Sequence, residues 1–434
     1  MKKIALVSHG CAKNLVDSEL MLGLLTQNGY EITLDDSIAD VVIVNTCAFI
    51  NDAERESIQS ILELINEGKK VIVAGCLAQK HKDELKKEIP EIVAMIGPTD
   101  IEKLVDILKE LNIEYLDKVS DNPNYEYLEN VERQQITVGA SSYIKVADGC
   151  NFRCGYCIIP YLRGDFHSRK MEKIIQEAKT LVARGVTEIV LIAQDTTSYG
   201  IDIYKKNALK DLLIELNKIE NLSWIRIMYA YPTNMPDDLL EAISKLDKVV
   251  KYIDIPLQHS HPEMLKAMNR PAFDYRKLVN NFRDKIPNLG IRTAFIVGYP
   301  GETDEHFEHL YNFIKDMKFN KMGVFKYSRE KGTPSYKLKP LVPKRVMNER
   351  YKKLMLLQQQ ISKEINESFI GKTLDCIIES YTDDGMVIAR SQYDAPEVDG
   401  VVYIKTDKPV IPGDIEQVMI VDCYEYDLIG EIIE

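Results

Sequence analysis

Long apolar runs are missing from this sequence of 434 residues. No stretch approaches the roughly 18 consecutive apolar residues that a membrane helix needs. The opening "MKKIALVSHG" has a short apolar run, but His9 and Gly10 end it too early for a secretory signal. Low-complexity tracts and repeats of fixed period are also lacking. We therefore expect a cytoplasmic globular protein that does not bind membranes.

Basic residues are scarce in the last part of the chain. The segment 367–434 contains sixteen Asp and Glu but four Lys and Arg, so it alone carries a net charge of -12, equal to that of the whole chain. A module with this charge repels phosphate backbones and attracts basic surfaces. A solvated face that keeps the protein soluble is the alternative explanation.

The apolar pattern predicts an α/β fold with three parts. Between residues 1 and 111, apolar runs at 4–8, 41–45 and 71–75 alternate with helical patterns, which is typical of a doubly wound parallel sheet. Six more strand candidates, separated by helical stretches, follow at 143–149, 188–195, 224–232, 252–259, 292–300 and 321–328. Six units are too few for a closed eight-stranded barrel, so we expect a partial (β/α)6 barrel.

The last part has a different pattern. A long amphipathic helix is expected at 345–366, and the short β-rich runs after about residue 368 predict a small antiparallel β-barrel. Residues 112–140 are polar and poorly periodic, so a domain boundary falls there. The expected domains are 1–125, 136–366 and 367–434.

Three of the eight cysteines stand close together in one loop. Cytosolic thiols stay reduced, so cysteines in such a protein indicate metal or redox chemistry. Cys150, Cys154 and Cys157 form a C-x3-C-x2-C pattern directly after the first barrel strand, on the expected catalytic face. Three thiolates hold three irons of a 4Fe-4S cluster and leave the fourth iron open. A zinc site would more often show four protein ligands.

Three further cysteines each follow a strand of the predicted parallel sheet. Cys11, Cys47 and Cys76 occupy equivalent positions after the runs at 4–8, 41–45 and 71–75. Because loops at the carboxyl ends of parallel strands converge on one edge of a sheet, we expect these thiols to meet in space. The alternative is three small buried hydrophobic residues. Cys376 and Cys423 lie in apolar runs and are expected in the core of the terminal barrel.

The first of these loops resembles the signature of radical S-adenosylmethionine (SAM) enzymes, C-x3-C-x-aromatic-C, with Tyr156 as the aromatic residue. Together with "SHGCAKNLVDSE", "VNTCAFI" and "AGCLAQ", the chain is similar along nearly its whole length to the methylthiotransferases. That resemblance implies a radical SAM domain between an N-terminal cluster domain and a TRAM β-barrel. It also implies SAM and two 4Fe-4S clusters as cofactors, an auxiliary cluster on Cys11, Cys47 and Cys76 and a SAM-binding one on Cys150, Cys154 and Cys157.

In this family, cleavage of SAM generates a radical that converts an unactivated C–H bond into C–S–CH3. "FIVGYPGET" (295–303) resembles the glycine-rich strand end near SAM, which places Gly298 and Pro300 at the cofactor, although a plain turn explains the motif equally well. Tyr156 is a further candidate SAM contact, and Gln194 and Asp195, at the end of the second barrel strand, are candidates to contact the ribose or methionine of SAM. No residue beyond the cluster ligands is expected to be catalytic.

Four other residues are open to two explanations. Gln258 and His259 end a barrel strand and either line the pocket or, for His259, make a local hydrogen bond. Arg163 and Arg169 either pair with a carboxylate of SAM or of the substrate, or are exposed surface residues.

The family has a tRNA branch (MiaB-type), which modifies adenosine, and a ribosomal-protein branch (RimO-type), which modifies the β-carbon of an aspartate in small-subunit ribosomal protein S-twelve. The segments 157–169, 255–261 and 392–400 resemble the second branch, and the acidic terminal barrel suits a basic protein better than RNA. The expected partners are this ribosomal protein, an external one-electron donor of the flavodoxin or ferredoxin type and a sulfur donor. The protein is expected to be a monomer.

Overall fold

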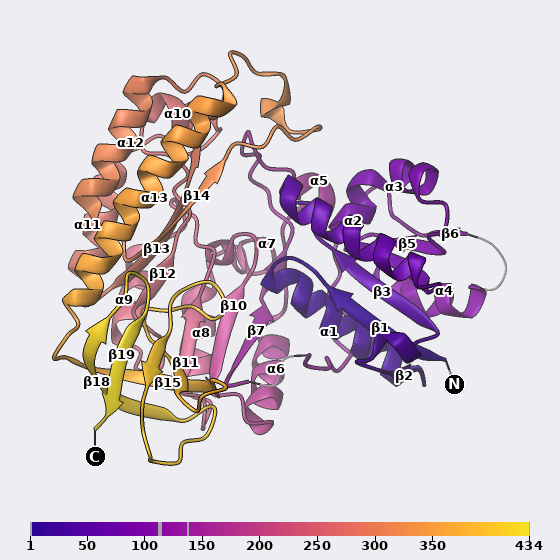
Figure 1. Cartoon of the computed structure of the whole chain (residues 1–434), viewed down its shortest axis with the longest axis horizontal. Helices are drawn as coiled ribbons and strands as arrows, with labels where there is room; N and C mark the ends of the chain where they lie inside the picture. Colours follow the sequence, from indigo (N-terminus) through magenta and orange to yellow (C-terminus); the bar gives the residue numbers. More distant parts are fainter. Residues whose placement is uncertain (1, 112–114, 137–138, 434) are drawn as a thin grey trace. The chain divides into compact units, whose positions relative to one another are not determined.

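The computed structural model describes residues 2–111, 115–136 and 139–433. The chain forms two compact units (Figure 1). The first comprises residues 1–138, 147–153 and 157–169, and the second comprises 139–146, 154–156 and 170–434. Within the described ranges, every helix is too short or too polar to span a bilayer.

The first unit is built on a six-stranded parallel sheet, as the alternation of apolar runs predicts. The spatial order of its strands is β2 (Glu31–Ile32), β1 (Lys3–Ser8), β3 (Val41–Thr46), β4 (Lys70–Gly75), β5 (Ala94–Ile96) and β6 (Leu116–Asp117). All six residues of β3 are buried, because helices cover both faces of a doubly wound sheet. The apolar runs that precede Cys11, Cys47 and Cys76 are β1, β3 and β4.

The connections of this sheet are helical. The sheet is flanked by α1 (Ala12–Gln27), α2 (Asn51–Asn66), α3 (Cys76–Glu88) and α4 (Leu104–Glu110). Part of the cysteine-rich loop also belongs to this unit, with β8 (Ala147–Asp148), α5 (Ile159–Arg163) and β9 (His167–Ser168). Ile158 and Leu162 pack in the same apolar cluster as Val42 and Leu77, which anchors this loop segment to the sheet.

The second unit begins with the predicted partial (β/α)6 barrel. Its strands form two parallel groups, β7 (Ser141–Lys145), β10 (Glu188–Ile192) and β11 (Trp224–Ile227), then β12 (Tyr252–Asp254), β13 (Gly290–Val297) and β14 (Lys321–Lys326). An isolated parallel bridge between Ile225 and Val249, and a hydrogen bond from the Ala230 amide to the Asp254 carbonyl, join the two groups. The six strands are therefore continuous and open between β7 and β14.

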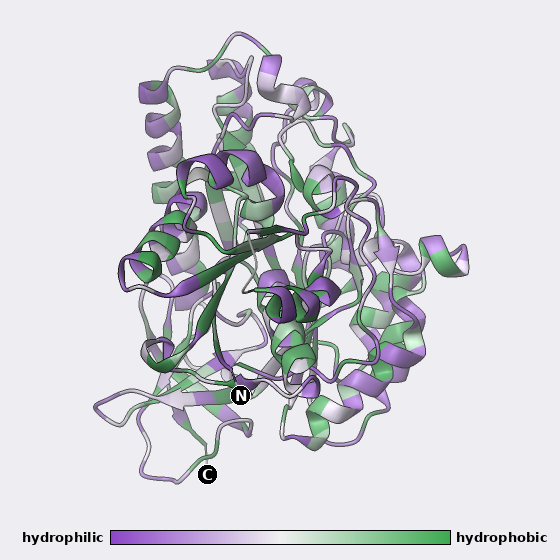
Figure 2. Ribbon diagram, turned by 90° about the vertical axis from the view of Figure 1, so that its right-hand side faces the viewer, coloured by the Kyte–Doolittle hydropathy of each residue, from purple (hydrophilic) through white to green (hydrophobic). Residues whose placement is uncertain are grey.

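Helices cover the outside of these strands. They are α6 (Met171–Ala183), α7 (Ile201–Tyr204), α8 (Leu209–Asn217), α9 (Asp237–Lys245), α10 (Pro262–Ala267), α11 (Tyr275–Lys285), α12 (Asp304–Met317) and α13 (Lys344–Glu367). The last is the predicted long helix. Colouring by hydropathy shows green, apolar strands and helices that are green on one side and purple on the other (Figure 2).

The chain ends in a closed five-stranded barrel, drawn in yellow in Figure 1. Its strands are β15 (Thr373–Tyr381), β16 (Val387–Ser391), β17 (Val402–Ile404), β18 (Ile415–Cys423) and β19 (Leu428–Ile432). The small barrel is confirmed, with one difference in detail. Strands β17 and β19 pair in parallel, whereas the other neighbouring strands pair antiparallel.

A buried network of ion pairs fastens this barrel to the amino ends of the (β/α)6 strands. Glu188 of β10 accepts hydrogen bonds from Arg226 Nε (2.8 Å), Arg390 Nη2 (2.5 Å) and Ser141 Oγ (2.6 Å). Two residues of the loop after β16 make further contacts. Asp394 pairs with Lys321 at 2.6 Å, and Asp399 accepts a hydrogen bond from the Tyr252 hydroxyl at 2.6 Å. The terminal barrel therefore lies against the amino ends of the (β/α)6 strands. The candidate SAM contacts of this unit lie at the opposite, carboxyl ends.

Candidate functional site

The loops of Cys11, Cys47 and Cys76 are tied together by side-chain hydrogen bonds. The Asn14 amide donates to the carbonyl oxygens of His9 and Thr46, each at 3.0 Å, and so joins the first two loops. Thr46 joins the second and third, since its hydroxyl donates to the Ala74 carbonyl at 2.6 Å and accepts from the Leu77 amide at 3.2 Å. The topology places the three loops on one edge of the sheet, and these bonds fix them there.

Glycines next to the cysteines make this close approach possible. Gly10, which precedes Cys11, has a φ of +100°, and a Cβ there would lie 2.7 Å from the Cβ of Cys47. Gly75, which precedes Cys76, has a φ of +92°, and a Cβ there would lie 2.4 Å from Asn45 Oδ1. Both positions therefore exclude larger residues for two reasons, the left-handed backbone and the lack of space.

The three thiols have different electrostatic surroundings. Burial raises the pKa of Cys47 to about 11, and burial also raises the pKa of Cys76. The pKa of Cys11 is lowered, because the desolvation that would raise it is outweighed by the charges of Lys13 and Arg163. The influence of each thiol on the others shows that they lie within electrostatic reach of one another. Three converging free thiols beside positive charges suit an iron–sulfur cluster, whose thiolate ligands are anionic.

The loop of Cys150, Cys154 and Cys157 spans both units. Cys150 and Cys157 belong to the first unit and Cys154 to the second. The Cys150 amide donates to the Gly164 carbonyl at 3.1 Å, and the Arg153 guanidinium donates to the Cys150 carbonyl at 2.6 Å. All three are free thiols, and Cys154 is buried while the other two are partly exposed.

Cys154 is held firmly within the second unit. The neighbouring Gly155 donates its amide to the Met268 carbonyl and accepts from the Ser335 amide, both at 2.8 Å. The buried Arg270 lies with Nη1 3.9 Å from the Cys154 sulfur, donates to the Pro256 carbonyl at 2.6 Å and stacks on Tyr231. Sequence reasoning did not single out Arg270, since a lone arginine after a helix carries no signal of its own.

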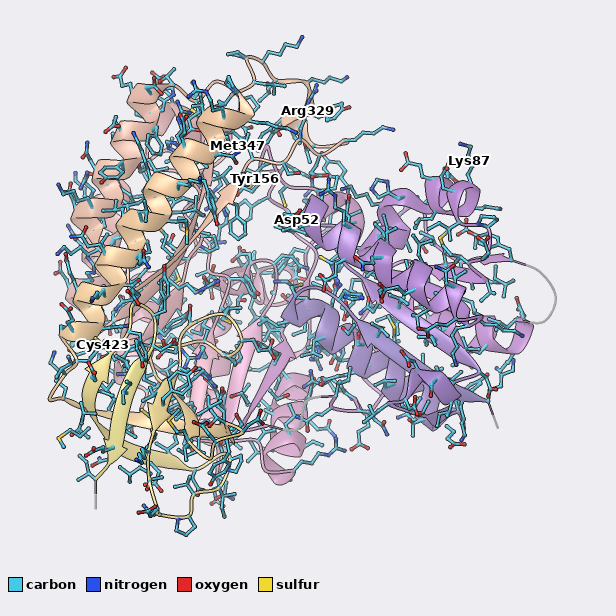
Figure 3. All side chains as sticks on the ribbon, in the orientation of Figure 1. Asp52, Lys87, Tyr156, Arg329, Met347 and Cys423 are labelled. Carbon is cyan, nitrogen blue, oxygen red and sulfur yellow. The ribbon has the colours of Figure 1, made fainter. Side chains whose placement is uncertain are left out.

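The predicted SAM contacts lie on the same face of the second unit. Tyr156 packs against an apolar cluster that contains Tyr299 and Ile296, at the end of β13. The backbone at Gly298 has a φ of +79°, and a Cβ there would lie 2.6 Å from Met347 Cγ. Figure 3 labels Tyr156 and Met347, both of which belong to the second unit.

The glycine-rich turn is closed by its own residues. The Glu302 carboxylate accepts from the Gly298 amide and pairs with Arg350 at 3.3 Å. Pro300 is buried inside this turn, and the next residue, Gly301, donates its amide to the Pro340 carbonyl at 2.9 Å. The motif is therefore a tightly braced loop that follows a parallel strand, which is the usual position of ligand-binding loops.

Gln194 and Asp195 follow β10 but differ in their surroundings. Gln194 is partly exposed at the strand end. Asp195 is buried and accepts hydrogen bonds from Thr197, Ser198 and Asn234. Asp195 therefore serves the local turn, and Gln194 is the more accessible of the two residues.

The two explanations for His259 can be separated. His259 is fully buried, and its Nδ1 accepts from the His261 amide at 3.0 Å, so the local hydrogen bond is confirmed. Burial and the neighbouring histidines hold the pKa of His259 well below its usual range. The ring is then neutral, with its proton on Nε2, 4.0 Å from Glu302 Oε1. The partly exposed Gln258 has a φ of +72°, a strained backbone of the kind found at ligand sites.

Arg163 and Arg169 are both buried and paired with carboxylates of the first unit. Arg163 pairs with Asp17 and Asp148. Arg169 donates twice to Glu129 at 2.9 Å and stacks on the Tyr127 ring. The explanation as exposed surface residues is therefore wrong for both arginines, while a carboxylate of SAM or of the substrate as a further partner stays a prediction.

A group of histidines near α10 and α12 is explained by helix capping. The potential metal ligands of His261, Glu263 and His306 lie within 4.8 Å of one another. However, His261 Nδ1 accepts from the Glu263 amide and His306 Nδ1 from the Thr303 amide, while His306 Nε2 lies 3.2 Å from Glu263 Oε2. These bonds account for the cluster without a metal. Cys376 is buried in the core of the terminal barrel, as expected, whereas Cys423 is partly exposed and packs against that core.

Comparisons with known proteins agree with this arrangement. Residues 3–97 match an uncharacterized protein family, UPF0004, residues 144–314 match the radical SAM superfamily and residues 370–433 match the TRAM domain. The chain is 48% identical to the ribosomal protein uS12 methylthiotransferase RimO of Caldanaerobacter subterraneus, over 99% of this chain and 100% of that one. It is 46% identical to the RimO of Thermoanaerobacter sp., with the same coverage.

Among solved structures, the radical SAM methyltransferase TsrM of Kitasatospora setae, with tryptophan and a SAM analogue bound, has a TM-score of 0.57. The match covers 89% of this chain and 79% of that one at 14% identity, and so shows a shared fold. The sequence matches to the two RimO proteins show family membership as well as fold, because they cover nearly the whole chain at 46% and 48% identity. This chain belongs to the RimO family of radical SAM methylthiotransferases, enzymes that use SAM and 4Fe-4S clusters.

Proposed function

We propose that this enzyme methylthiolates the β-carbon of an aspartate in ribosomal protein uS12, the protein after which its RimO relatives are named. The observation that carries the proposal is the presence of two sets of three free cysteines. One set lies at the converging ends of β1, β3 and β4, and the other lies in the loop after β8. Three-cysteine sets suit clusters that keep one iron open for a further ligand.

The residues of each set have separate roles in this proposal. Cys150, Cys154 and Cys157 hold the cluster that binds SAM, and Cys11, Cys47 and Cys76 hold an auxiliary cluster. The bound cofactors supply one-electron activation of a C–H bond, the sulfur atom and the methyl group. Within the second unit, Arg270 and the clamped Gly155 orient Cys154. Tyr156, Gln194, Gly298 and Pro300 line the SAM pocket.

The acidic terminal barrel docks the basic substrate protein. Its exposed carboxylates include those of Asp375, Asp383, Asp384, Asp407, Asp422 and Glu431. A surface of this sign repels the phosphates of tRNA and steers a basic ribosomal protein toward the enzyme. The domains in this proposal are 1–125, 136–366 and 367–434, and an external one-electron donor and a sulfur donor serve a monomeric, cytoplasmic enzyme.

The substrate is tested by offering the reduced enzyme and SAM either uS12 or tRNA and then weighing the products. We expect uS12 to gain the mass of one SCH2 group on a single aspartate and tRNA to stay unchanged. A gain on tRNA alone would transfer the proposal to the tRNA branch of the family.

The cluster assignment is tested by iron analysis after anaerobic reconstitution. Two clusters predict about eight irons per chain. Replacement of Cys11, Cys47 and Cys76 by Ala is expected to remove about half of the iron. Replacement of Cys376 and Cys423, which belong to the terminal barrel, is expected to leave the count unchanged. Unchanged iron in the first variant would contradict the auxiliary site.

A further inference from the structure

Arg163 is the buried residue that links the cysteine loop to the auxiliary site within the first unit. It is 2% exposed, and its Nη1 lies 2.8 Å from Asp148 and 3.0 Å from Asp17. Its Nη2 donates to Asn14 Oδ1 at 2.7 Å. Asn14 is the residue that joins the loops of Cys11 and Cys47, so Arg163 braces the scaffold that brings the thiols together.

The charge of the same guanidinium acts on the thiols of the auxiliary set. It favours the thiolate of Cys76. Lys13 and Arg163 together also lower the pKa of Cys11. Arg163 is therefore a buried positive charge within electrostatic reach of two ligands of this set.

The balance of charges here depends on Arg163. Lys13 and Arg163 are buried cations, and Asp17 and Asp148 are buried anions, so the four charges cancel. A 4Fe-4S core held by three thiolates is itself anionic in its ordinary oxidised state. Without Arg163, Lys13 alone would balance the two buried carboxylates of Asp17 and Asp148. One uncompensated negative charge would then lie near an anionic cluster.

We propose that Arg163 sets the reduction potential of the cluster on Cys11, Cys47 and Cys76, as a positioning residue that places a buried positive charge beside the loops that carry its ligands. This inference rests on the proposed function, because it requires the auxiliary cluster. The net charge around a cluster is one of the properties that set such potentials. The positive charge of Arg163 favours the reduced, more negative cluster.

The test is a potentiometric titration of the reconstituted full-length enzyme, followed by electron paramagnetic resonance. SAM alters the signal of the cluster that it binds, so the signal that SAM leaves unchanged reports the auxiliary cluster. We expect Arg163→Gln to shift the midpoint of that signal to a more negative potential. Arg163→Lys keeps the charge but loses the planar fork, so a smaller shift in the same direction is expected.

Two further variants make the test decisive. Asp17→Asn removes a neighbouring negative charge and is expected to shift the midpoint to a more positive potential. Arg169→Gln removes a buried arginine of the same segment that pairs with Glu129 instead, and is expected to leave the midpoint unchanged. If Arg163→Gln does not retain the cluster, Arg163→Lys and Asp17→Asn decide the question, because they predict shifts of opposite sign.

The outcomes separate the two proposals. A wild-type enzyme with about four irons and one signal would overturn the auxiliary cluster and, with it, the proposed function. Two clusters whose midpoints are the same in the wild type, Arg163→Gln and Asp17→Asn would overturn the role of Arg163 alone. Shifts of the same sign in Arg163→Lys and Asp17→Asn would also overturn it, because charge would then not be the cause.

Discussion

Glu188 is the residue on which the attachment of the terminal barrel depends most. It is fully buried and pairs with Arg226 of the (β/α)6 barrel and Arg390 of the terminal barrel. Burial alone would raise the pKa of Glu188, but the charges of the two arginines outweigh it and hold that pKa at about 2. Relative to an ordinary glutamate at about 4.3, the difference corresponds to about 3 kcal/mol of folding free energy.

Replacement of Glu188 by Gln keeps the size of the side chain and removes its charge. We expect the free energy of unfolding of the second unit to fall by about 3 kcal/mol, because two buried arginines lose their carboxylate. With a denaturant dependence of about 3 kcal/mol per molar urea, the midpoint moves by on the order of 1 M. The assay is urea denaturation followed by fluorescence of Trp224, the single tryptophan, which pairs in register with Glu188 across β10 and β11.

The dependence on pH gives a second check. A carboxylate with a lowered pKa contributes stability that is complete above about pH 5 and is lost as the pH falls toward 2. The difference between the wild type and Glu188→Gln is therefore constant from pH 8 to about 5 and narrows below it. Glu220→Gln, at an exposed position in the same unit, is the matched control. If both variants unfold at the wild-type midpoint, the network does not stabilise the unit and the reasoning is refuted.

Three further predictions concern the sites. Gly298→Ala is expected to weaken SAM binding measured by equilibrium dialysis, because an alanine in the left-handed backbone conformation costs about 1–2 kcal/mol and its Cβ clashes with Met347. The double variant Gly298→Ala/Met347→Ala removes the clash and should recover only part of the lost affinity. Full recovery would show that the backbone is not strained. Asp383→Lys/Asp407→Lys on the barrel is expected to slow association with uS12 in stopped-flow measurements and to flatten its salt dependence, whereas Glu220→Lys outside the barrel should do neither. Arg270→Gln is expected to shift the midpoint of the SAM-sensitive cluster signal to a more negative potential, since Arg270 lies 3.9 Å from Cys154, and an unchanged midpoint would exclude this role.

The sequence predicted those features that follow from periodicity and topology. The convergence of Cys11, Cys47 and Cys76 could be inferred because equivalent loops of a parallel sheet share one edge. The lengths of the barrel strands were less predictable. The run 252–259 reads as one strand, but β12 ends at Asp254. Pro256, which has no N–H to donate, interrupts the ladder, and pairing with β13 resumes as an isolated bridge between Gln258 and Phe295.

Long-range polar contacts could not be predicted, because an ion pair between distant residues leaves no periodic pattern in a sequence. Arg163 lies in the loop of the second cysteine set, and this position suggested a role toward SAM or the substrate. Its partners Asn14 and Asp17 are more than a hundred residues away. The parallel pairing of β17 with β19 escaped prediction for the same reason, since alternation defines a strand but not its neighbour.

The segment 392–400, "QYDAPEVDG", which resembles one branch of the family, makes structural contacts within the chain. Asp394 and Asp399 are held by Lys321 and Arg292 at the amino ends of the barrel strands, and the Pro396 carbonyl accepts from the Tyr143 hydroxyl at 3.2 Å. In (β/α) barrels this face serves stability, while chemistry occurs at the carboxyl ends. The segment therefore fixes the position of the terminal barrel on the amino ends of the (β/α)6 strands.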